Sequence, residues 1–310
     1  MARKKITIVG AGNVGATTAH IAAGRGLGDI VLLDIIEGLA AGKALDMSES
    51  AGVYPFSGSV SGDVEWRQAA GSDIVIITSG LARKPGMSRD DLLAKNAKIV
   101  QSVCGHIVRQ CPDAFVIVVC NPLDAMVYTA ARTTGFAKNR VMGMAGALDS
   151  ARFACFISRE LGVSCGDVAG VLMGGHGDDM VPLPRYTAVA GIPLTELMSD
   201  ERIAALIDRA RNGGIEIVNL LGYSAYYAPA AGAVKMAEAI LTDARCVMSC
   251  CAWCETEYGG GGAFVGVPVV LGAAGVERVV ELDLNDSEKK AFAESAAHVK
   301  SLVAKIDRML

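Results

Sequence analysis

Short, almost unbroken aliphatic runs alternate with helix-like segments along the first half of the chain. The aliphatic runs predict strands over 5–10, 29–34, 73–80 and 114–122. The segments that follow them predict helices over 13–26, 37–50, 89–111 and 124–135. Strands that are apolar on both faces and separated by helices are typical of a parallel sheet covered on both sides. The pattern therefore predicts an α/β fold that begins with a doubly wound parallel sheet.

The second half has a less regular pattern. It predicts helices over 149–162, about 201–221, 229–241 and from about Ser287 onward. Within 166–177 a strand is expected to run into a glycine-rich turn, and strands over 245–256 and 263–271 are expected to flank a glycine-rich hairpin loop. We interpret this half as a mixed α+β catalytic domain. A boundary within "GMAGAL" (143–148) gives two domains, 1–145 and 146–310.

Composition excludes several classes of protein. The 310 residues are 52% hydrophobic and 20% charged, with 29 Lys and Arg against 33 Asp and Glu, so a nucleic-acid partner is not indicated. The apolar runs are far too short to span a membrane, and "ITIV" is too short for the core of a secretion signal. Nine cysteines in a chain of this size indicate reduced thiols, so a cytoplasmic location is expected.

The first predicted strand leads into "GAGNVG" (10–15), which fits G-x-G-x-x-G. Between a strand and a helix this motif indicates dinucleotide binding: Gly10 permits the turn, Gly12 lets pyrophosphate approach, and Gly15 allows close packing. The first part is thus predicted as a Rossmann domain. Asp34 ends the second strand, where a carboxylate accepts ribose hydroxyls and repels a 2′-phosphate, which favours NAD over NADP. The alternative is that Asp34 caps the next helix.

His176 lies in "MGGHGD" (173–178), among small neighbours that leave its imidazole reachable. Its pKa range suits proton exchange with an alcohol. In "LDSAR", Asp149 and Arg152 share one helix face and offer an orienting carboxylate and a cation; the alternative is an N-cap and a surface arginine. Asn121 follows a parallel strand, at the end where ligands bind, and its amide can donate a hydrogen bond to a substrate; the alternative is an Asx turn with no ligand role.

These motifs, in order and spacing, resemble the lactate/malate dehydrogenase family. "GAGNVG", "ARKPGMSR", "NPLD", "LDSAR" and "GGHGD" are joined by "GYSAYYAPAAG" (222–232) and "FVGVPVVLG" (264–272), so the resemblance covers essentially the whole chain. Within the family the chain is most similar to the lactate-dehydrogenase-like bacterial malate dehydrogenases.

The resemblance implies a role for each matched residue. His176 would exchange the substrate proton, Asp149 would orient it, Arg152 would clamp the C1 carboxylate, and Arg89 would polarise the reacting carbonyl. Asn121 would contact substrate and cofactor. The implied NAD contacts are Gly10, Ala11, Gly12, Asn13, Val14, Gly15, Asp34, Asn96, Val119, Cys120 and Asn121.

Arg83 is the residue by which the resemblance implies a substrate. Family members that act on malate tend to carry arginine at this position, where lactate enzymes carry glutamine. A guanidinium on a closing loop can pair with the second carboxylate of malate or oxaloacetate, and it disfavours a monocarboxylate. The implied activity is reversible NAD-dependent malate oxidation in the tricarboxylic acid cycle, by a homo-dimer or homo-tetramer that needs no metal.

Three alternatives stay open at this point. A lactate or other 2-hydroxyacid dehydrogenase is disfavoured by Arg83 and by Ala225, where lactate enzymes tend to have threonine. A non-catalytic NAD-binding scaffold is disfavoured because His176, Asp149 and the arginines are all present. Cys251 and Cys254 form C-x-x-C, but alternation along a strand would place them on opposite faces, so small core residues explain them better than a metal or redox site.

Overall fold

A parallel sheet forms the first half of the protein. The computed structural model describes residues 3–81, 88–259 and 261–309. All neighbouring pairs in this sheet run parallel, in the order β3-β2-β1-β4-β5-β6. The strands are β1 (Lys5–Val9), β2 (Asp29–Leu33), β3 (Val60–Asp63), β4 (Ile74–Ile77), β5 (Phe115–Val118) and β6 (Val141–Gly143). The predicted Rossmann arrangement is confirmed. The sequence did not predict β3 or β6, because β3 is a half-exposed edge strand with one aliphatic residue and β6 has only three residues.

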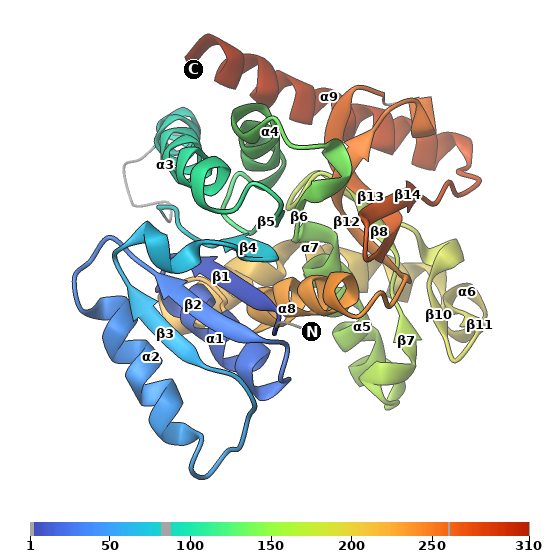
Figure 1. Ribbon diagram of the computed structural model, residues 1–310. Coiled ribbons are helices and arrows are strands. Elements are labelled where there is room, and N and C mark those ends of the chain that lie inside the picture. The colour runs from blue at the N-terminus through green and yellow to red at the C-terminus, as the bar shows by residue number, and fades with distance from the viewer. Residues whose placement is uncertain (1–2, 82–87, 260, 310) are drawn as a thin grey trace.

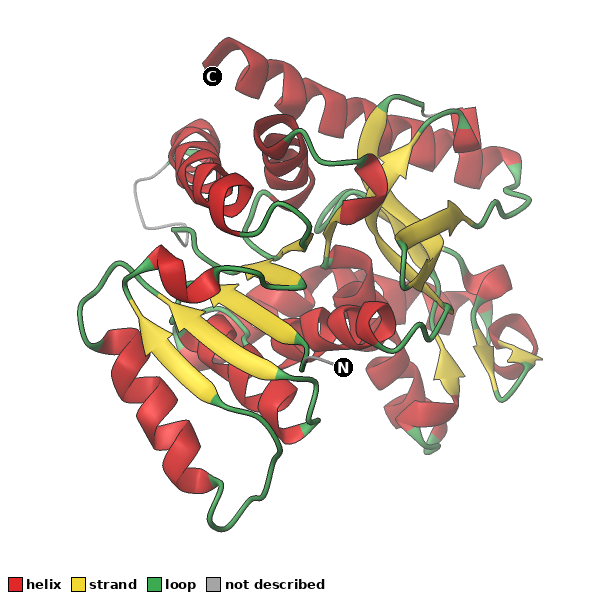
Figure 2. Cartoon of the chain, in the orientation of Figure 1, coloured by secondary structure: helices red, strands yellow, loops and turns green. Residues whose placement is uncertain are grey.

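Helices cover both faces of this sheet (Figure 2). The first-half helices are α1 (Asn13–Gly24), α2 (Leu39–Ser50), α3 (Arg89–Gln110) and α4 (Leu123–Thr134). Side chains that alternate along β1 point to opposite layers: Ile6 and Ile8 enter the core beside α1, and Val9 enters the core beside α3 and α4. The face beside α1 is also covered by α8 (Tyr227–Leu241), a helix from the second half of the chain.

The second half extends the same sheet. Strand β12 pairs with β6 through Cys251 and Gly143, and the order continues through β13 and β8 to β9, with β14 beside β13. We therefore observe one 11-stranded sheet across both halves in the described residues, where sequence analysis predicted two separate units. A separate three-stranded sheet has the order β11-β10-β7. In Figure 1 the orange strands β12 and β13 continue from the green β6.

The remaining elements agree broadly with the prediction. The helix predicted from 149 begins earlier, at Ala145. The strand predicted within 166–177, ahead of a glycine-rich turn, is two short strands, and a loop follows the second of them. The predicted domain boundary falls at the start of α5. The strands are β7 (Val168–Ala169), β8 (Leu172–Gly174), β9 (Met180–Pro182), β10 (Ala188–Val189), β11 (Ile192–Pro193), β12 (Cys246–Cys254), β13 (Ala263–Gly272) and β14 (Gly275–Val279). The helices are α5 (Ala145–Leu161), α6 (Leu194–Leu197), α7 (Asp200–Leu221), α8 and α9 (Asp286–Met309).

Strand β12 confirms the interpretation of the cysteine run. Cys250 and Cys254 enter the core on one face of the sheet, and Cys251 enters the core on the other face. All nine cysteines are free thiols. Cys251 and Cys254 therefore do not face a shared site.

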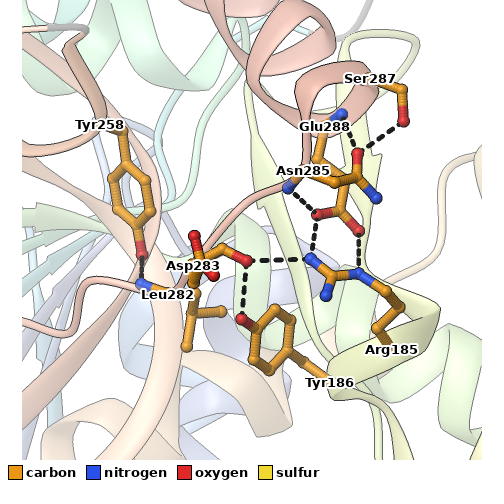
Figure 3. Close-up of polar contacts among 8 residues, drawn as sticks. All are labelled: Arg185, Tyr186, Tyr258, Leu282, Asp283, Asn285, Ser287 and Glu288. Carbon is orange, nitrogen blue, oxygen red and sulfur yellow. Dashed lines mark hydrogen bonds and ion pairs between the residues drawn. The ribbon is translucent and has the colours of Figure 1, made fainter.

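The last helix is anchored at its first turn by a capping box. Asn285 Oδ1 accepts the Glu288 N–H at 2.9 Å, and Glu288 Oε2 accepts the Asn285 N–H at 2.9 Å. Arg185 donates to both carboxylate oxygens of Glu288, at 3.1 and 2.7 Å, and to the carbonyl of Asp283 (Figure 3). This network fixes the start of α9, which then packs along α4 and reaches the loop after β8.

No helix in the described part of the chain is both long enough and apolar enough to cross a membrane.

Candidate active site

The glycine-rich turn between β1 and α1 has the geometry that a bound phosphate requires. Gly10 has a φ of +104°, and a Cβ there would lie 2.7 Å from the Ser79 nitrogen. A Cβ on Gly15 would lie 1.8 Å from the Gly10 carbonyl oxygen. A Cβ on Gly12 would meet nothing within 4 Å, so this side of the turn is open to a ligand. Helix α1 begins directly after Gly12 and presents its N-terminus there.

Asp34 stabilises this turn from the end of β2. Its carboxylate accepts the Ala11 N–H at 2.6 Å and the Ile36 N–H at 3.0 Å. The N-cap of α2 is Gly38, so the alternative that Asp34 caps this helix is wrong. The partly buried carboxylate is placed beside the turn, as a ribose partner must be.

Two residues that hold the turn were missed by the sequence analysis. Lys43 Nζ donates to the Ala11 carbonyl at 2.6 Å, and Thr78 Oγ1 donates to the Val9 and Gly10 carbonyls at 3.0 and 2.9 Å. Thr78 directly follows β4, the neighbour of β1 in the sheet, and this position could have indicated a residue close to the glycine-rich turn. Lys43 lies within α2 and has no local signal.

Asn96 joins the ends of two neighbouring strand segments. The side chain is fully buried. Its Oδ1 accepts the Leu81 N–H at 2.8 Å, and its Nδ2 donates to the carbonyls of Leu81 and Asn121 at 3.1 and 2.6 Å. Val119 and Cys120 lead into the exposed Asn121 on the same connection. The structure thus brings Asn96 and 119–121 together beyond the carboxyl end of β5.

His176 and Asp149 form the central pair of the site. His176 lies in the loop after β8, and its Nδ1 lies 2.8 Å from Asp149 Oδ2 on α5. Burial lowers the pKa of His176, but the charge and hydrogen bond of Asp149, helped by Asp124, outweigh burial and raise the net pKa above its usual value. With Nδ1 held by the carboxylate, Nε2 is the nitrogen that can exchange a proton with a ligand.

Arg152 completes this cluster. Its Nη1 donates to Asp149 Oδ1 at 3.3 Å, and its side chain is only 14% exposed. Asp149 lies in the second turn of α5, which begins after Met144. The alternatives of an N-cap aspartate and a surface arginine are therefore both wrong.

The guanidinium of Arg152 has unused binding capacity. Its buried Nε has no hydrogen-bond partner within the described ranges. Burial lowers the pKa of Arg152, with Asp149 opposing the shift. Gly213 and Gly214 of α7 lie beside this side chain and leave space around it. A buried, half-satisfied guanidinium is suited to a carboxylate ligand.

The two loop arginines are placed differently. Arg89 is the first residue of α3, is 76% exposed at its side chain, and lies 3.7 Å from the carboxylate of Asp178. The structure does not bring it to the ring of His176. Arg83 lies outside the described residues.

Asp124 was also missed, although it stands in the quoted "NPLD". Its buried carboxylate accepts the backbone N–H of His176 at 3.1 Å. The neighbouring Gly175 N–H donates to the buried Ser295 Oγ of α9 at 2.7 Å. The position of Asp124 could have been noticed in the sequence, because an acidic residue in the first turn of a helix follows a strand end where ligands bind. The local sequence around Ser295 gives no such indication. Among the described residues, no cluster of three or more His, Cys, Asp and Glu side chains could hold a metal ion.

Comparison with known proteins relates both halves to one family. Residues 4–143 match "lactate/malate dehydrogenase, NAD binding domain", and residues 146–309 match "lactate/malate dehydrogenase, alpha/beta C-terminal domain". The chain is 54% identical to the malate dehydrogenase of Rhodopirellula baltica, over 100% of this chain and 99% of that protein.

The fold is also similar to those of solved structures. Malate dehydrogenase from Salinibacter ruber has a TM-score of 0.95 at 50% identity, with 98% of each chain covered. Lactate dehydrogenase from Cryptosporidium parvum, solved with lactic acid and nicotinamide adenine dinucleotide, has a TM-score of 0.95 at 40% identity, with 99% of each chain covered.

Proposed function

Because this chain belongs to the lactate/malate dehydrogenase family, we propose that His176, Asp149 and Arg152 form the centre at which it oxidises malate. The activity is NAD-dependent and reversible: (S)-malate and NAD⁺ give oxaloacetate, NADH and a proton. The open side of Gly12, the N-terminus of α1 and the carboxylate of Asp34 fit a dinucleotide with free ribose hydroxyls. We assign 1–145 to the cofactor and 146–310 to the substrate, in line with the ranges of the two family matches.

His176 is the proposed proton acceptor for malate oxidation. Its Nε2 takes the proton of the C2 hydroxyl while the C2 hydrogen leaves with its electron pair; NAD, when bound, supplies the hydride acceptor. Asp149 stabilises the imidazolium through the 2.8 Å contact to Nδ1. In the reverse direction the same imidazolium returns the proton to the carbonyl oxygen of oxaloacetate.

Three arginines are proposed to hold the dicarboxylate. Arg152 binds the C1 carboxylate with the donors that the protein leaves free. Arg89 would leave its exposed position near Asp178 to reach the developing charge on the substrate oxygen. Arg83 pairs with the second carboxylate, as its match to the family's loop motif implies. Asn121 contacts substrate from the end of β5, and Asn96 acts on the cofactor through the backbone segments that it joins.

The single observation that carries this assignment is the His176–Asp149–Arg152 cluster, in which a buried carboxylate contacts a half-buried imidazole and a half-buried guanidinium. We would measure kcat/KM with NADH for oxaloacetate and for pyruvate in wild type and in Arg83→Gln. A preference for oxaloacetate that collapses in the variant supports Arg83 as the selector. Lys84→Gln removes a neighbouring cation and is the matched control; it should keep the preference. Better turnover of pyruvate by the wild type would indicate another 2-hydroxyacid specificity, and NADH binding without turnover of either substrate would indicate a scaffold.

We also propose that the protein is a homo-oligomer, a dimer or tetramer. A groove of about 890 Å³ between α5 and α8 is open to solvent and is lined mainly by small, mostly apolar side chains, together with Arg25, Lys235 and Glu238. A second copy of the chain would cover this apolar surface. Light scattering coupled to size exclusion tests this, because Ala151→Arg places a charged side chain in the groove and should yield monomers. A wild type that elutes as a monomer at micromolar concentration would contradict the proposal.

The cellular setting is proposed from chemistry alone. The nine free thiols suit the reducing cytoplasm, and interconversion of malate and oxaloacetate suits the tricarboxylic acid cycle. Cell fractionation and metabolite levels after deletion of the gene would check both.

A further inference from the structure

Asp124 is a buried acid with an unexplained oxygen. It is the second residue of α4 and is 6% exposed. Its Oδ2 accepts the backbone N–H of His176 at 3.1 Å. Its Oδ1 is buried and has no hydrogen-bond partner in the part of the chain that the structure describes. Burying a carboxylate with one oxygen unsatisfied is unfavourable, so the position needs a further reason.

The N-terminus of α4 supplies only part of that reason. A carboxylate in the first turn interacts favourably with the helix dipole, but an exposed carboxylate would do the same without the cost of desolvation. The carboxylate lies instead against the segment that carries the imidazole of His176. A negative charge at that place stabilises the protonated imidazole relative to the neutral one.

We propose that Asp124 is a positioning residue for the malate–oxaloacetate reaction: it fixes the backbone of His176 and supplies a second negative charge that stabilises the imidazolium. The inference rests on the function proposed above for His176. It assigns the unsatisfied oxygen of Asp124 to charge stabilisation rather than to packing. Asp149 holds the ring from one side, and Asp124 holds the backbone of the same residue from another.

Within the described ranges, the charged and titratable groups around Asp124 and His176 come from α5, from β12 and from the loop after β8. Asp149 and Arg152 face His176 from α5. The Cys251 thiol of β12 lies beside Asp124; burial raises the pKa of Asp124, whereas the His176 N–H and Cys251 lower it. On the same loop, Asp179 pairs with His298 of α9 at 2.5 Å. Among the described residues, Asp124 is the acid whose carboxylate accepts the backbone N–H of His176.

Asp124→Asn separates charge from geometry. The amide keeps an oxygen that can accept the His176 N–H, but it removes the negative charge. Ser295→Ala is the matched control, because it removes the neighbouring hydrogen bond from Gly175, measured at 2.7 Å, without changing any charge. The pH dependence of kcat/KM for oxaloacetate reduction would be measured for wild type and both variants, together with the Kd for NADH.

We expect the Asp124→Asn profile to lose activity at a lower pH, with a midpoint lower by about half to one unit. Above the wild-type midpoint, kcat/KM should fall about 3- to 10-fold, with the Kd for NADH unchanged. The Ser295→Ala midpoint should stay at the wild-type value, whatever its maximal rate. If Asp124→Asn is insoluble, Asp124→Ser keeps an oxygen acceptor and takes its place.

A midpoint that is unchanged in Asp124→Asn, or equally lowered in Ser295→Ala, would overturn the inference and leave Asp124 as a purely structural anchor. Failure of the proposed function is distinguishable from this outcome. A wild type that binds NADH and reduces no oxaloacetate contradicts the assigned reaction, whereas an active wild type with unshifted variants contradicts only the role of Asp124.

Discussion

Replacement of Asp149 by asparagine should change the pH dependence of catalysis more than it changes the fold. The carboxylate lies 2.8 Å from His176 Nδ1, and its side chain is 4% exposed, so little water screens the interaction. A hydrogen bond to a charged partner contributes about 1.5–3 kcal/mol. At about 1.4 kcal/mol for each pKa unit, loss of the charge should lower the pKa of His176 by about one to two units.

The consequence differs with pH. Oxaloacetate reduction needs a protonated His176, so above the wild-type midpoint kcat/KM should fall about 10- to 100-fold in Asp149→Asn. At acidic pH, where the imidazole is protonated in both proteins, the loss should be smaller. Malate oxidation should also slow, because an asparagine amide can donate to Nδ1 and move the ring proton to Nε2.

The assay is NADH consumption across the pH range in which histidine titrates, with NADH affinity measured in parallel. Glu160→Gln is the matched control: it removes a carboxylate from the same helix, where Glu160 pairs with Arg202 away from the site. The reasoning would be refuted by an Asp149→Asn profile with the wild-type midpoint, or by an equal shift in Glu160→Gln.

Five further substitutions test three separate parts of the structure: the substrate clamp, the glycine-rich turn and the start of α9. Arg152→Lys should lower kcat/KM for oxaloacetate about 100-fold, mainly through KM, because an ammonium cannot bind a carboxylate through two parallel N–H groups; steady-state kinetics with an unaltered KM would contradict the clamp. Gly12→Ala should fold normally, since its Cβ meets nothing within 4 Å, but should weaken NADH binding at least about tenfold, whereas Gly15→Ala, with a Cβ 1.8 Å from the Gly10 oxygen, should also lower the melting temperature. Asn285→Ala should lower the free energy of unfolding in urea by about 1 kcal/mol through loss of the cap on α9. The hydrogen bond from Arg185 lowers the pKa of Glu288 below its usual 4.5, so the stabilisation by Glu288 should be complete above that value and lost as pH falls through the lowered pKa; Glu288→Gln should abolish this acid dependence.

The first half of the fold could be predicted because its signals are local. Runs such as 29–34 and 73–80 are apolar on both faces, and the G-x-G-x-x-G turn lies directly between a strand and a helix. Strand β3 could not be predicted because an exposed edge strand needs few apolar residues. The pairing of Cys251 with Gly143 joins residues more than a hundred positions apart, so no local pattern reveals the continuous sheet.

The residues of the candidate site also fall into two groups, those with a local sequence signal and those without one. His176, Asp149, Arg152 and Asp34 stand in short motifs whose residue types indicate their chemistry, and the structure places the first three together. Residues that support them, such as Ser295, approach from distant elements and have ordinary local surroundings. These residues act through contacts with residues that are far away in the sequence, and no local pattern reveals such contacts.

The continuous sheet determines how this chain can be divided into fragments. A fragment that ends at residue 145 would lack β12, which pairs with β6, and α8, which covers the alanines of α1. Its exposed strand edge and apolar layer would favour aggregation over independent folding. Residues 1–145 are therefore not expected to fold when they are fused to an unrelated partner. A chimaera between relatives should tolerate a junction near residue 145 only where the incoming half brings a matching helix and strand.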